Sequence, residues 1–433
     1  QTYVRVRSFG LGWTIAKIRE EFLTRIQRLV HGGTDDSYVT WWKLYGQPSA
    51  TTLDEQRAQS LSEKAGAPQI SIVMPVFETP VHLLQTAVNS VLNQTYANWE
   101  LCIADDASTD PALLAYLREL DQSDTRIKVA FRKQNGHISA ASNSALALAK
   151  GTYVGFLDHD DELTPNALHE VMQVFHRKPD TVLVYSDEDV ISEDGKPLYP
   201  QFKPDWNPDF ARSINYICHF MVLRRDHLTQ LGGFRENHYD GAQDFDLMLR
   251  ATESLSAGLI QHIPKVLYHW RATSNSSVSN HSNKDYTTAA GIRALNEYYQ
   301  RLGINATAET SEIPTAYRTR YHLPSPAPSA TLIVPTHNNL RVLRVCIDSI
   351  LEKTCYDNFE ILVVDNRSDD PATQEYMQSC TQRGIRIVNY DDEFNFSAIN
   401  NFAVSQCDSE IIVLLNNDTE VCNPDWLTEL VSQ

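Results

Sequence analysis

ISIVMPVFETPVHLLQTAVNSVLNQTYANWELCIADDASTD, residues 70–110, holds two apolar β-branched runs on either side of a helical pattern. Between the runs, apolar residues recur on one helical face at Leu84, Val88, Val91 and Leu92. A strand, a helix and a second strand with short connections form a right-handed crossover unit. The sequence therefore predicts an α/β fold with a parallel sheet and helices on its faces.

A third strand of the same kind ends in a cluster of carboxylates. Residues 153–163 read YVGFLDHDDEL, so Asp158, Asp160 and Asp161 directly follow an apolar run. Because ligands of parallel sheets bind at the carboxyl ends of the strands, we expect this turn to line one crevice with the turns of the first two strands. Closely spaced carboxylates suit Mg²⁺ or Mn²⁺, which also bind substrate phosphates. The alternative is a solvated acidic turn, since aspartate is common in turns.

Composition and charge limit the class of protein. The chain has 433 residues, enough for two to three domains, and a formal net charge of −18 from 55 acidic and 37 basic residues. No nucleic-acid partner is expected, because phosphate neutralisation requires clustered Lys and Arg. An anionic nucleotide sugar remains possible, because a bound metal ion carries the local positive charge.

Cysteine usage and hydropathy bear on the compartment. The seven cysteines include no Cys-x-x-Cys pair, which predicts buried free thiols in a reducing, cytoplasmic compartment. No run of 18 apolar residues and no signal peptide are visible, so no membrane span is predicted. The chain begins at Gln1 without a methionine, so we expect a fragment of a longer protein.

The first 30 residues differ in charge from the rest. Six basic residues stand against Glu20 and Glu21, a net charge of +4, and apolar residues recur at helical spacing. One interpretation is an amphipathic helix on an anionic membrane surface, which would make the protein peripheral at the inner face of the cell membrane. The modest charge favours instead a helix that packs on the following domain or belongs to an upstream one. Residues 1–67 are predicted to form a helical N-terminal extension.

The chain repeats itself at an offset of 260 residues. Residues 331–372 align without a gap on residues 71–112, and residues 410–421 match the strand and acidic turn at 153–163. The second turn holds Asn416, Asn417 and Asp418. The repetition indicates a duplicated domain.

A proline-rich segment separates the two copies. PSPAPSA, residues 324–330, is predicted to be a stiff, extended linker. We therefore expect a first domain over residues 68–323 and a second over residues 331–433. The second copy stops just past its acidic turn and lacks everything that would match residues 166–278, so we expect a truncated domain.

Seven segments, taken in order, carry a family resemblance. They are SIVMPVFE, NSVLNQTY, IADDASTD, NGHISAASNSAL, GTYVGFLDHDDEL, GGFRENHYDGAQDFDLMLRA and VLYHWR. With them the chain resembles a family 2 glycosyltransferase of the GT-A fold, from about Gln69 to Val278 and again from Ala330 to the end. YSDEDV and FKPDWNPD resemble members that build bacterial surface polysaccharides, including multi-domain rhamnosyltransferase-like proteins. The resemblance implies a Rossmann-like, mixed but mostly parallel sheet with flanking helices, followed by a second, partial GT-A-like copy.

The resemblance gives the acidic turn a role in binding a nucleoside diphosphate sugar. Asp160 is predicted to bind Mn²⁺ or Mg²⁺ directly, and Asp158 to bind the ribose, or the metal through water. The ion would offset the charge that develops on the β-phosphate. The resemblance also implies His269 as a third metal ligand. The alternative for His269 is stacking between Tyr268 and Trp270.

The turns after the first strands are predicted to contact the nucleotide through backbone groups and one carboxylate. The sequence does not decide whether Asp105 or Asp106 accepts the base N–H, and Gly136 would let the backbone approach closely. Arg271 is predicted to contact the diphosphate, with stacking on Trp270 as the alternative. The predicted nucleotide-sugar-binding residues are Pro75, Val76, Phe77, Glu78, Asp105, Asp106, Asn135, Gly136, His137, Asp158 and Arg271.

A base is needed to take the proton of the acceptor hydroxyl. In the family this base is an aspartate that usually follows a glutamate; here Gln243 takes the place of the glutamate and Asp244 that of the base. A carboxylate in the first turn of a helix is kept ionised by the helix dipole, although Asp244 could also be an ordinary N-terminal helix acid. Asp246 is expected to cap the helix or to pair with Arg250. The candidate acceptor residues are Trp206, Asn215 and Tyr216, whereas Asp187 and Asp189 are predicted to be structural.

Three functions compete. The resemblance favours an inverting, metal-dependent transferase that moves a sugar onto a growing, lipid-linked surface glycan of O-antigen or capsule type. The alternative is a non-catalytic nucleotide-sugar-binding scaffold module of a larger polysaccharide-assembly protein, which suits the truncated second copy better than the first. A nucleotidyltransferase is less favoured, because VFETPVHL is neither basic nor glycine-rich. A dehydrogenase is disfavoured because no GxGxxG follows a strand.

Overall fold

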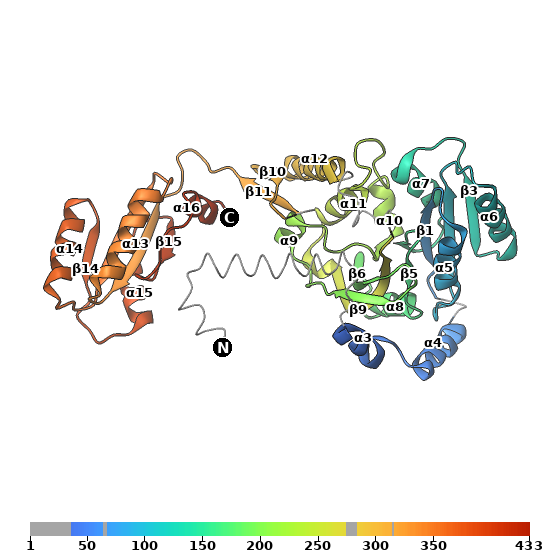
Figure 1. The fold of residues 1–433 in the computed structure, drawn as a ribbon, viewed down its shortest axis with the longest axis horizontal. Helices are drawn as coiled ribbons and strands as arrows, with labels where there is room; N and C mark the ends of the chain where they lie inside the picture. Colours follow the sequence, from blue (N-terminus) through green and yellow to red (C-terminus); the bar gives the residue numbers. More distant parts are fainter. Residues whose placement is uncertain (1–35, 64–66, 274–283, 314–315) are drawn as a thin grey trace. The chain divides into compact units, whose positions relative to one another are not determined.

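The computed structural model describes residues 36–63, 67–273, 284–313 and 316–433, which form two compact units (Figure 1). The first unit consists of the described residues up to Ile304 and the segment Ala308–Thr319. The second unit consists of Asn305–Thr307 and Arg320–Gln433. The basic amphipathic helix predicted within residues 1–30 lies outside the described residues. None of the helices in the described ranges is long and apolar enough to cross a membrane.

The first unit is built on one mixed, mostly parallel sheet. Its strands are β1 (Ile70–Val76), β2 (Trp99–Asp105), β3 (Ile127–Phe131), β4 (Tyr153–Phe156), β5 (Glu162–Leu163), β6 (Leu183–Ile191), β7 (Pro197–Gln201), β8 (Met221–Arg224) and β9 (Ile260–Arg271). They lie in the order β3-β2-β1-β4-β8-β6-β9-β5, and β7 pairs with β6. β1 to β4 are parallel, as are β6 and β9, whereas β8 runs antiparallel to its neighbours β4 and β6. The predicted fold class is confirmed for this unit.

Helices cover both faces of this sheet. They are α5 (Val81–Leu92), α6 (Pro111–Ser123), α7 (His137–Leu146), α8 (Ala167–Arg177), α9 (Pro208–Ser213), α10 (Arg225–Gln230), α11 (Gln243–Thr252), the short 3₁₀ turn η2 (Ala257–Leu259) and α12 (Lys284–Leu302). Ahead of β1 lie α3 (Asp36–Trp41), the π-helical turn η1 (Trp42–Gly46) and α4 (Ala50–Glu63). These last three elements are the described part of the predicted N-terminal extension.

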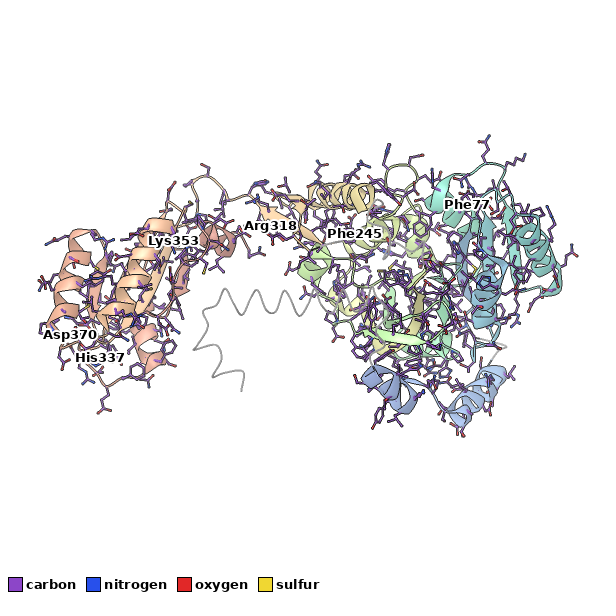
Figure 2. The ribbon with its side chains drawn as sticks, in the orientation of Figure 1. Phe77, Phe245, Arg318, His337, Lys353 and Asp370 are labelled. Carbon is purple, nitrogen blue, oxygen red and sulfur yellow. The ribbon has the colours of Figure 1, made fainter. Side chains whose placement is uncertain are left out.

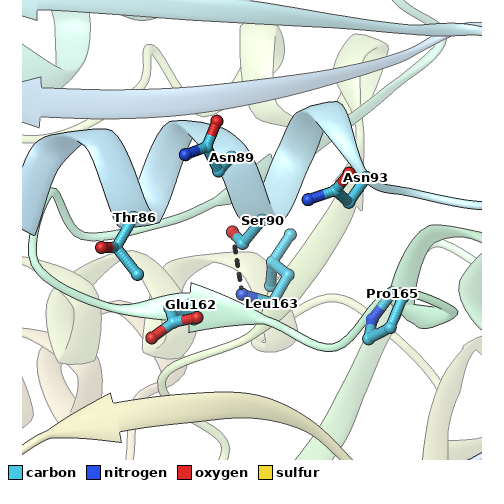
Figure 3. A pocket seen from close by; sticks show the side chains of 7 residues that line it. All are labelled: Thr86, Asn89, Ser90, Asn93, Glu162, Leu163 and Pro165. Atoms are coloured by element: carbon cyan, nitrogen blue, oxygen red, sulfur yellow. Dashed lines mark hydrogen bonds between the residues drawn. The ribbon is translucent and has the colours of Figure 1, made fainter. Parts of the chain in front are cut away.

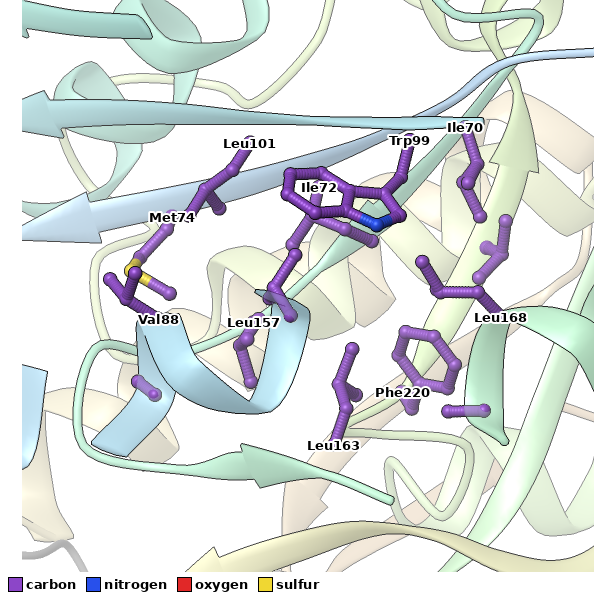
Figure 4. Close-up of a cluster of buried hydrophobic side chains, with 14 of the residues drawn as sticks. Ile70, Ile72, Met74, Val88, Trp99, Leu101, Leu157, Leu163, Leu168 and Phe220 are labelled. Carbon is purple, nitrogen blue, oxygen red and sulfur yellow. The ribbon is translucent and has the colours of Figure 1, made fainter. Parts of the chain in front are cut away.

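The core of the first unit follows from the alternation of β1. Ile70, Ile72 and Met74 project to one face and are fully buried there against Leu84 and Val88 of α5 (Figure 4). β2 runs beside β1 and adds further side chains to the same cluster, among them Trp99 and Leu101. Both strands are buried along their whole length, as expected for parallel strands covered on both faces.

The second unit repeats the first half of this design. Its parallel sheet has the order β14-β13-β12-β15, and its strands are β12 (Ala330–Thr336), β13 (Phe359–Asp365), β14 (Arg386–Asn389) and β15 (Ile411–Leu414). Its helices are α13 (Leu340–Lys353), α14 (Pro371–Gln382), α15 (Phe396–Val404) and α16 (Trp426–Val431). Residues 320–433, as described, contain no counterpart of β6 to β9. The predicted partial copy is therefore present.

Register and capping confirm the duplication at the level of single residues. Ile70 of β1 pairs with Trp99 of β2, and Ala330 of β12 pairs with Phe359 of β13, each 260 residues further on. The helix after each second strand begins at a proline whose preceding aspartate caps it. Asp110 accepts a hydrogen bond from the backbone N–H of Ala112, and Asp370 accepts one from Thr373 (Figure 2).

A two-stranded ribbon completes the described residues. Its strands are β10 (Ala306–Thr310) and β11 (Tyr317–Tyr321). The aromatic ring of Tyr317 stacks on Phe245 of α11 with the ring centroids 5.1 Å apart. All seven cysteines are free, as predicted, but Cys355 and Cys422 are exposed, so the prediction of buried thiols does not hold for these two.

Candidate active site

The three aspartates of the acidic turn after β4 differ in burial and in their hydrogen-bond partners. Asp161 is buried, and its two oxygens accept hydrogen bonds from the Tyr268 hydroxyl at 2.5 Å and the Arg271 backbone N–H at 2.7 Å. Asp158 and Asp160 are only half-buried. Asp161 therefore anchors the turn to β9, and Asp158 and Asp160 are left at the crevice.

Negative charge accumulates at this edge of the sheet. Burial raises the pKa of Asp158; the nearby His219 opposes this rise, and the carboxylates of Asp160 and Asp244 reinforce it. Asp158 thus lies near the carboxylate of Asp160 in its own turn and near that of Asp244 on α11. A cation between these groups would relieve both the desolvation and the mutual repulsion.

The donor set of the turn fits a divalent ion that is shared with a substrate. Across residues 36–63, 67–273, 284–313 and 316–433, no three His, Cys, Asp or Glu side chains surround one point closely enough to hold an ion by themselves. Asp158 and Asp160 supply hard oxygen ligands, and Mg²⁺ commonly takes only one or two carboxylates and completes its shell with water and phosphate oxygens. These two residues fit such an ion in the presence of a diphosphate.

The structure corrects the prediction that His269 is a third metal ligand. Its Nδ1 lies 2.5 Å from Asp189 Oδ1, and its ring packs edge-on against Trp42 at 5.2 Å. Successive residues of a strand face opposite sides. Because Tyr268 points toward the acidic turn, His269 points away from it, toward the N-terminal extension.

A different histidine, His219, faces the acidic turn, and sequence reasoning missed it. It precedes β8, and its ring stacks on Tyr268 at 5.3 Å and lies 4.8 Å from that of Trp270. Its Nδ1 lies 3.2 Å from Glu188 Oε2, and Glu188 also pairs with Lys203 at 3.0 Å. No sequence motif marks His219, because Glu188 comes from a strand 31 residues earlier.

The ionisation of this histidine is set by its acidic neighbours. Burial alone would lower the pKa of His219, but the Glu188 carboxylate, and after it Asp161 and Asp158, outweigh burial and raise it to about 9. At neutral pH the imidazole is therefore protonated. The crevice contains one positive side chain beside its carboxylates.

Asp244, the predicted base, lies in the first turn of α11. It is half-buried, and its Oδ2 accepts a hydrogen bond from Asn215 Nδ2 at 2.8 Å. Burial raises the pKa of Asp244, while His219 and the backbone N–H of Phe245 hold it down. The Oδ1 atom of Asn215 is buried and has no partner among the described residues. This orphaned acceptor lies on the residue that orients Asp244, where a hydroxyl of a bound molecule could satisfy it.

The neighbouring residue Asp246 is structural, as predicted. It is buried and pairs with Arg250 at 2.9 Å and with Arg235.

Asn143 of α7 accepts a hydrogen bond from the Phe234 backbone N–H at 2.9 Å and donates one to the Phe234 carbonyl at 2.9 Å. The loop that leads to α11 is thereby tied to α7.

The predicted nucleotide residues gather at the ends of β1 and β2. Glu78 Oε1 accepts hydrogen bonds from the Thr109 backbone N–H at 2.7 Å and its hydroxyl at 2.8 Å, and the Asp106 backbone N–H bonds the Val76 carbonyl. Pro75 and Val76 are buried at the strand end. Phe77 follows them and is 46% exposed, in the turn at the end of β1 (Figure 2).

The two candidate base-binding aspartates differ in their partners. Asp106 accepts hydrogen bonds from Arg132 Nε at 2.7 Å and from the Gly136 backbone N–H at 3.0 Å. Asp105 accepts only a longer bond, 3.3 Å, from the Ser108 backbone N–H. Asp106 therefore holds the turn of Asn135, Gly136 and His137 against β2, and Asp105 keeps its acceptor capacity.

The structure also corrects the prediction that Arg271 contacts the diphosphate, because its guanidinium group is bonded to other residues of the protein. The side chain is 3% exposed; it donates to the carbonyls of Asp160 at 2.9 Å and Glu193 at 2.8 Å, and it pairs with Glu162. It braces the backbone of the acidic turn and has no free face for a diphosphate.

The three candidate acceptor residues differ in burial and in their contacts. Tyr216 is buried, and its hydroxyl accepts a hydrogen bond from the Asn207 backbone N–H at 2.8 Å, so it is part of the core and cannot serve as an open stacking platform. Trp206 is half-buried and stacks on Tyr216 with the centroids 6.3 Å apart. Asn215, as described above, contacts the candidate base.

A small open pocket of about 240 Å³ lies between α5 and β5, next to the acidic turn. The Ser90 hydroxyl accepts a hydrogen bond from the Leu163 backbone N–H at 3.1 Å, and Glu162 lies on the strand opposite α5 (Figure 3). The hydrogen bond joins β5 to α5. The chain directly after the acidic turn is thereby held from the side opposite β9.

The turn of the second copy differs in composition. The β12–β15 register places Asn416, Asn417, Asp418 and Thr419 where the first copy has Asp158, His159, Asp160 and Asp161. Asn417 Nδ2 donates to Thr336 Oγ1 at 3.0 Å. The second copy thus retains one aspartate of the acidic turn.

Comparison with known sequences shows to which protein family the chain belongs. The family model described as glycosyl transferase family 2 matches residues 71–232 and 331–433, together more than half of the chain. An uncharacterized protein of Sinorhizobium fredii, y4gI, is 43% identical over 404 residues, which cover 92% of this chain and 44% of that protein. The O-antigen biosynthesis protein RfbC of Myxococcus xanthus is 41% identical over 392 residues, which cover 90% of this chain and 30% of RfbC. The chain thus spans less than half the length of these relatives.

More distant similarities cover the chain in part. A chondroitin synthase of Pasteurella multocida is 32% identical over 208 residues, 47% of this chain and 20% of the synthase. Among solved structures, residues 1–349 of S. aureus TarS in complex with UDP-GlcNAc are 17% identical, with a TM-score of 0.44, and the match covers 53% of this chain and 66% of that one.

Proposed function

Because the chain belongs to glycosyl transferase family 2, we propose that its first unit transfers a sugar from a nucleoside diphosphate sugar to a hydroxyl group, with inversion of configuration. One observation carries the proposal. The carboxylate of Asp244, in the first turn of α11, lies close enough to the acidic turn after β4 to raise the pKa of Asp158. In this proposal, the donor and the acceptor are served by separate carboxylates that lie near each other.

In the proposed reaction the acceptor oxygen attacks the anomeric carbon of the donor. The bond between that carbon and the β-phosphate oxygen breaks, the nucleoside diphosphate leaves, and the acceptor proton passes to Asp244. The raised pKa of Asp244 makes it a better proton acceptor than an ordinary surface aspartate. Asn215 holds the carboxylate of Asp244 by its amide, and the free Oδ1 of Asn215 is available for an acceptor hydroxyl.

The leaving diphosphate needs positive charge. Asp160 and Asp158 would hold Mn²⁺ or Mg²⁺, and the ion would neutralise the charge that develops on the β-phosphate. Protonated His219 adds a positive side chain of the protein itself to the same crevice. Asp161, Tyr268 and the backbone N–H of Arg271 keep the turn in place while the phosphate oxygens change charge.

The base of the nucleotide has a preferred partner in this proposal. Asp106 accepts hydrogen bonds from Arg132 and Gly136, and its counterpart in the second copy, Asn366, donates from its amide to the carbonyls of Tyr390 and Asp392 at 3.0 Å. The aspartate before each of them bonds only the backbone N–H of a serine within its own turn, Ser108 for Asp105 and Ser368 for Asp365, among the described residues. We therefore assign the base N–H to Asp105.

The acceptor is proposed to be a growing bacterial surface glycan on a lipid carrier, reached at the cytoplasmic face of the membrane. The similarity to RfbC, an O-antigen biosynthesis protein, supports this choice. The non-catalytic scaffold alternative retains support in the second unit, where Asn416 and Thr419 replace two of the three aspartates. Nothing in the crevice favours nucleotidyl transfer, since the turn after β1 carries no basic side chain.

Donor hydrolysis tests the proposal. The full chain is incubated with a panel of nucleoside diphosphate sugars, with Mn²⁺ or with EDTA, and release of the nucleoside diphosphate is followed. Release from one donor, dependent on the metal and lost in Asp160→Ala and Asp244→Asn, is the expected result. Asp226→Asn, which alters an exposed carboxylate on α10, is the matched control. Full turnover in both site variants contradicts the mechanism, and the absence of donor binding by calorimetry contradicts the function.

A further inference from the structure

The N-terminal extension reaches the strand that anchors the acidic turn. α3 and η1 lie beside β6 and β9 in the first unit (Figure 1). Tyr38 is 4% exposed and donates its hydroxyl proton to Asp189 Oδ2 at 2.6 Å. Trp42 is 5% exposed and packs against the ring of His269. The extension therefore covers the end of the sheet with two aromatic side chains.

A buried carboxylate connects this cover to β9. Asp189 on β6 is fully buried, and its register partner on β9 is His269. One carboxylate oxygen of Asp189 binds His269 Nδ1 at 2.5 Å and the other binds the Tyr38 hydroxyl. Burying a carboxylate is costly unless its oxygens are satisfied. Without Tyr38, one oxygen of Asp189 would lose its only hydrogen bond among the described residues.

The residues on either side of His269 hold the acidic turn. Tyr268 binds the Asp161 carboxylate and accepts a hydrogen bond from the Asp158 backbone N–H at 3.3 Å. Arg271 binds the other Asp161 oxygen through its backbone and the Asp160 carbonyl through its side chain. Within four consecutive residues, β9 thus contacts both the extension, through His269, and the acidic turn, through Tyr268 and Arg271.

A second attachment keeps the extension in place. On α4, Gln56 Oε1 accepts a hydrogen bond from the Thr95 hydroxyl at 3.0 Å, and Ser60 Oγ accepts one from the Ala97 backbone N–H at 2.7 Å. Both contacts are on the connection between α5 and β2, away from β9. The extension is therefore anchored at two separate places, and it is the α3 and η1 contacts that reach β6 and β9.

We propose that Tyr38, with Trp42, is a positioning residue for the proposed reaction: through Asp189 and His269 it fixes β9, and β9 fixes the acidic turn. The inference rests on the proposed function of Asp158 and Asp160, and it makes the N-terminal extension part of the active-site architecture. Apolar packing alone would attach the extension equally well. The buried hydrogen-bonded series from Tyr38 to His269 specifies, in addition, the orientation of both side chains.

Two measurements on the full chain test this, neither of which requires turnover. The first is hydrogen–deuterium exchange of peptides that contain residues 157–163. The second is Mn²⁺ binding, followed as free Mn²⁺ by electron paramagnetic resonance. Partners one step removed from a metal ligand commonly change its affinity about 10- to 100-fold, so Tyr38→Phe, several steps removed, is expected to weaken Mn²⁺ binding about threefold to tenfold. It should also speed exchange in the turn by a similar factor.

Two controls separate positioning from simple attachment. Tyr45→Phe changes a tyrosine of the same extension that is 74% exposed, and it should alter neither measurement. Gln56→Ala loosens α4 and should speed exchange in α4 while leaving residues 157–163 unchanged. Tyr38→Phe keeps the ring, so the fold should persist. Unchanged turn exchange in Tyr38→Phe overturns the inference, whatever the variant does to the melting temperature. If the wild-type chain binds no Mn²⁺, the proposed metal site fails, and the exchange data still decide the coupling.

Discussion

The ion pair between Glu188 and His219 predicts an uncommon pH dependence of stability. Burial alone would raise the pKa of Glu188, but Lys203 and His219 outweigh it and lower the pKa from 4.5 to about 2. The same contact raises the pKa of His219 from 6.5 to about 9. A carboxylate with a lowered pKa stabilises the fold above its unfolded value, and a histidine with a raised pKa stabilises it below its unfolded value. The pair contributes fully between about pH 4.5 and 6.5.

The magnitude follows from the size of the shifts. At ~1.4 kcal/mol per pKa unit, the change from 4.5 to about 2 for Glu188 and the change from 6.5 to about 9 for His219 each correspond to about 3 kcal/mol. The contact between the two groups is counted in both values, and Lys203, Asp161 and Asp158 contribute as well, so the two values are not added. The contribution should fall as the pH rises from 6.5 through 9, and again as it falls from 4.5 toward 2.

Urea unfolding in EDTA, followed by tryptophan fluorescence, measures this in the first unit. Trp270 lies 4.8 Å from His219, and Trp426 is the single tryptophan of residues 320–433. His219→Gln should cost about 3 kcal/mol at pH 6 and much less at pH 10, because the wild-type histidine is neutral there. His176→Gln, on the exposed face of α8, is the matched control. An equal cost of His219→Gln at both pH values would show that packing, and not charge, stabilises this site.

Three further results are expected. Asp244→Asn should lower kcat about 10²- to 10⁴-fold with little change in donor KM, because it removes the proton acceptor and keeps the shape; steady-state kinetics measures this. Asp418→Ala should leave nucleoside diphosphate release unchanged in the same assay in which Asp160→Ala abolishes it, since the proposed site lies in the first unit. Gly151→Ala should destabilise the first unit by about 1–3 kcal/mol, because its Cβ would lie 2.7 Å from the Gln69 carbonyl, whereas Gly258→Ala, with open space around it, should not; urea unfolding compares the two.

The fold could be predicted from the sequence because its signals are local. The alternation in β1, the helical spacing in α5 and the proline after Asp110 each depend on a few neighbouring residues. The register of the repeat follows from the ungapped alignment of the two copies, which places Ile70 and Ala330 at equivalent strand positions. The position of the acidic turn at the end of β4 follows with them.

The partners within the site could not be predicted in the same way. His219 meets Glu188 from 31 residues away, and Asn215 meets Asp244 from 29 residues away. No helical or strand periodicity of the sequence indicates such pairs, because they form only when β6, β8 and α11 pack together. Residues of a strand alternate in direction, so Tyr268 and His269 face opposite sides, but the sequence does not say which of the two faces the acidic turn.

The two copies show why the three aspartates of the turn are not equivalent. Asp161 is buried, and its carboxylate is satisfied by Tyr268 and Arg271 of β9, so an aspartate there is tolerable only where that strand is present. At the matching position of the second copy stands Thr419. Its hydroxyl donates to the Asn416 carbonyl at 2.9 Å, within the turn itself. A threonine needs no distant partner, and residues 320–433 as described contain no strand equivalent to β9. The carboxylate of Asp160 makes no hydrogen bond to β9 in the described part of the chain, and its counterpart Asp418 is retained. The anchoring aspartate therefore depends on β9, while the exposed aspartate is compatible with either unit.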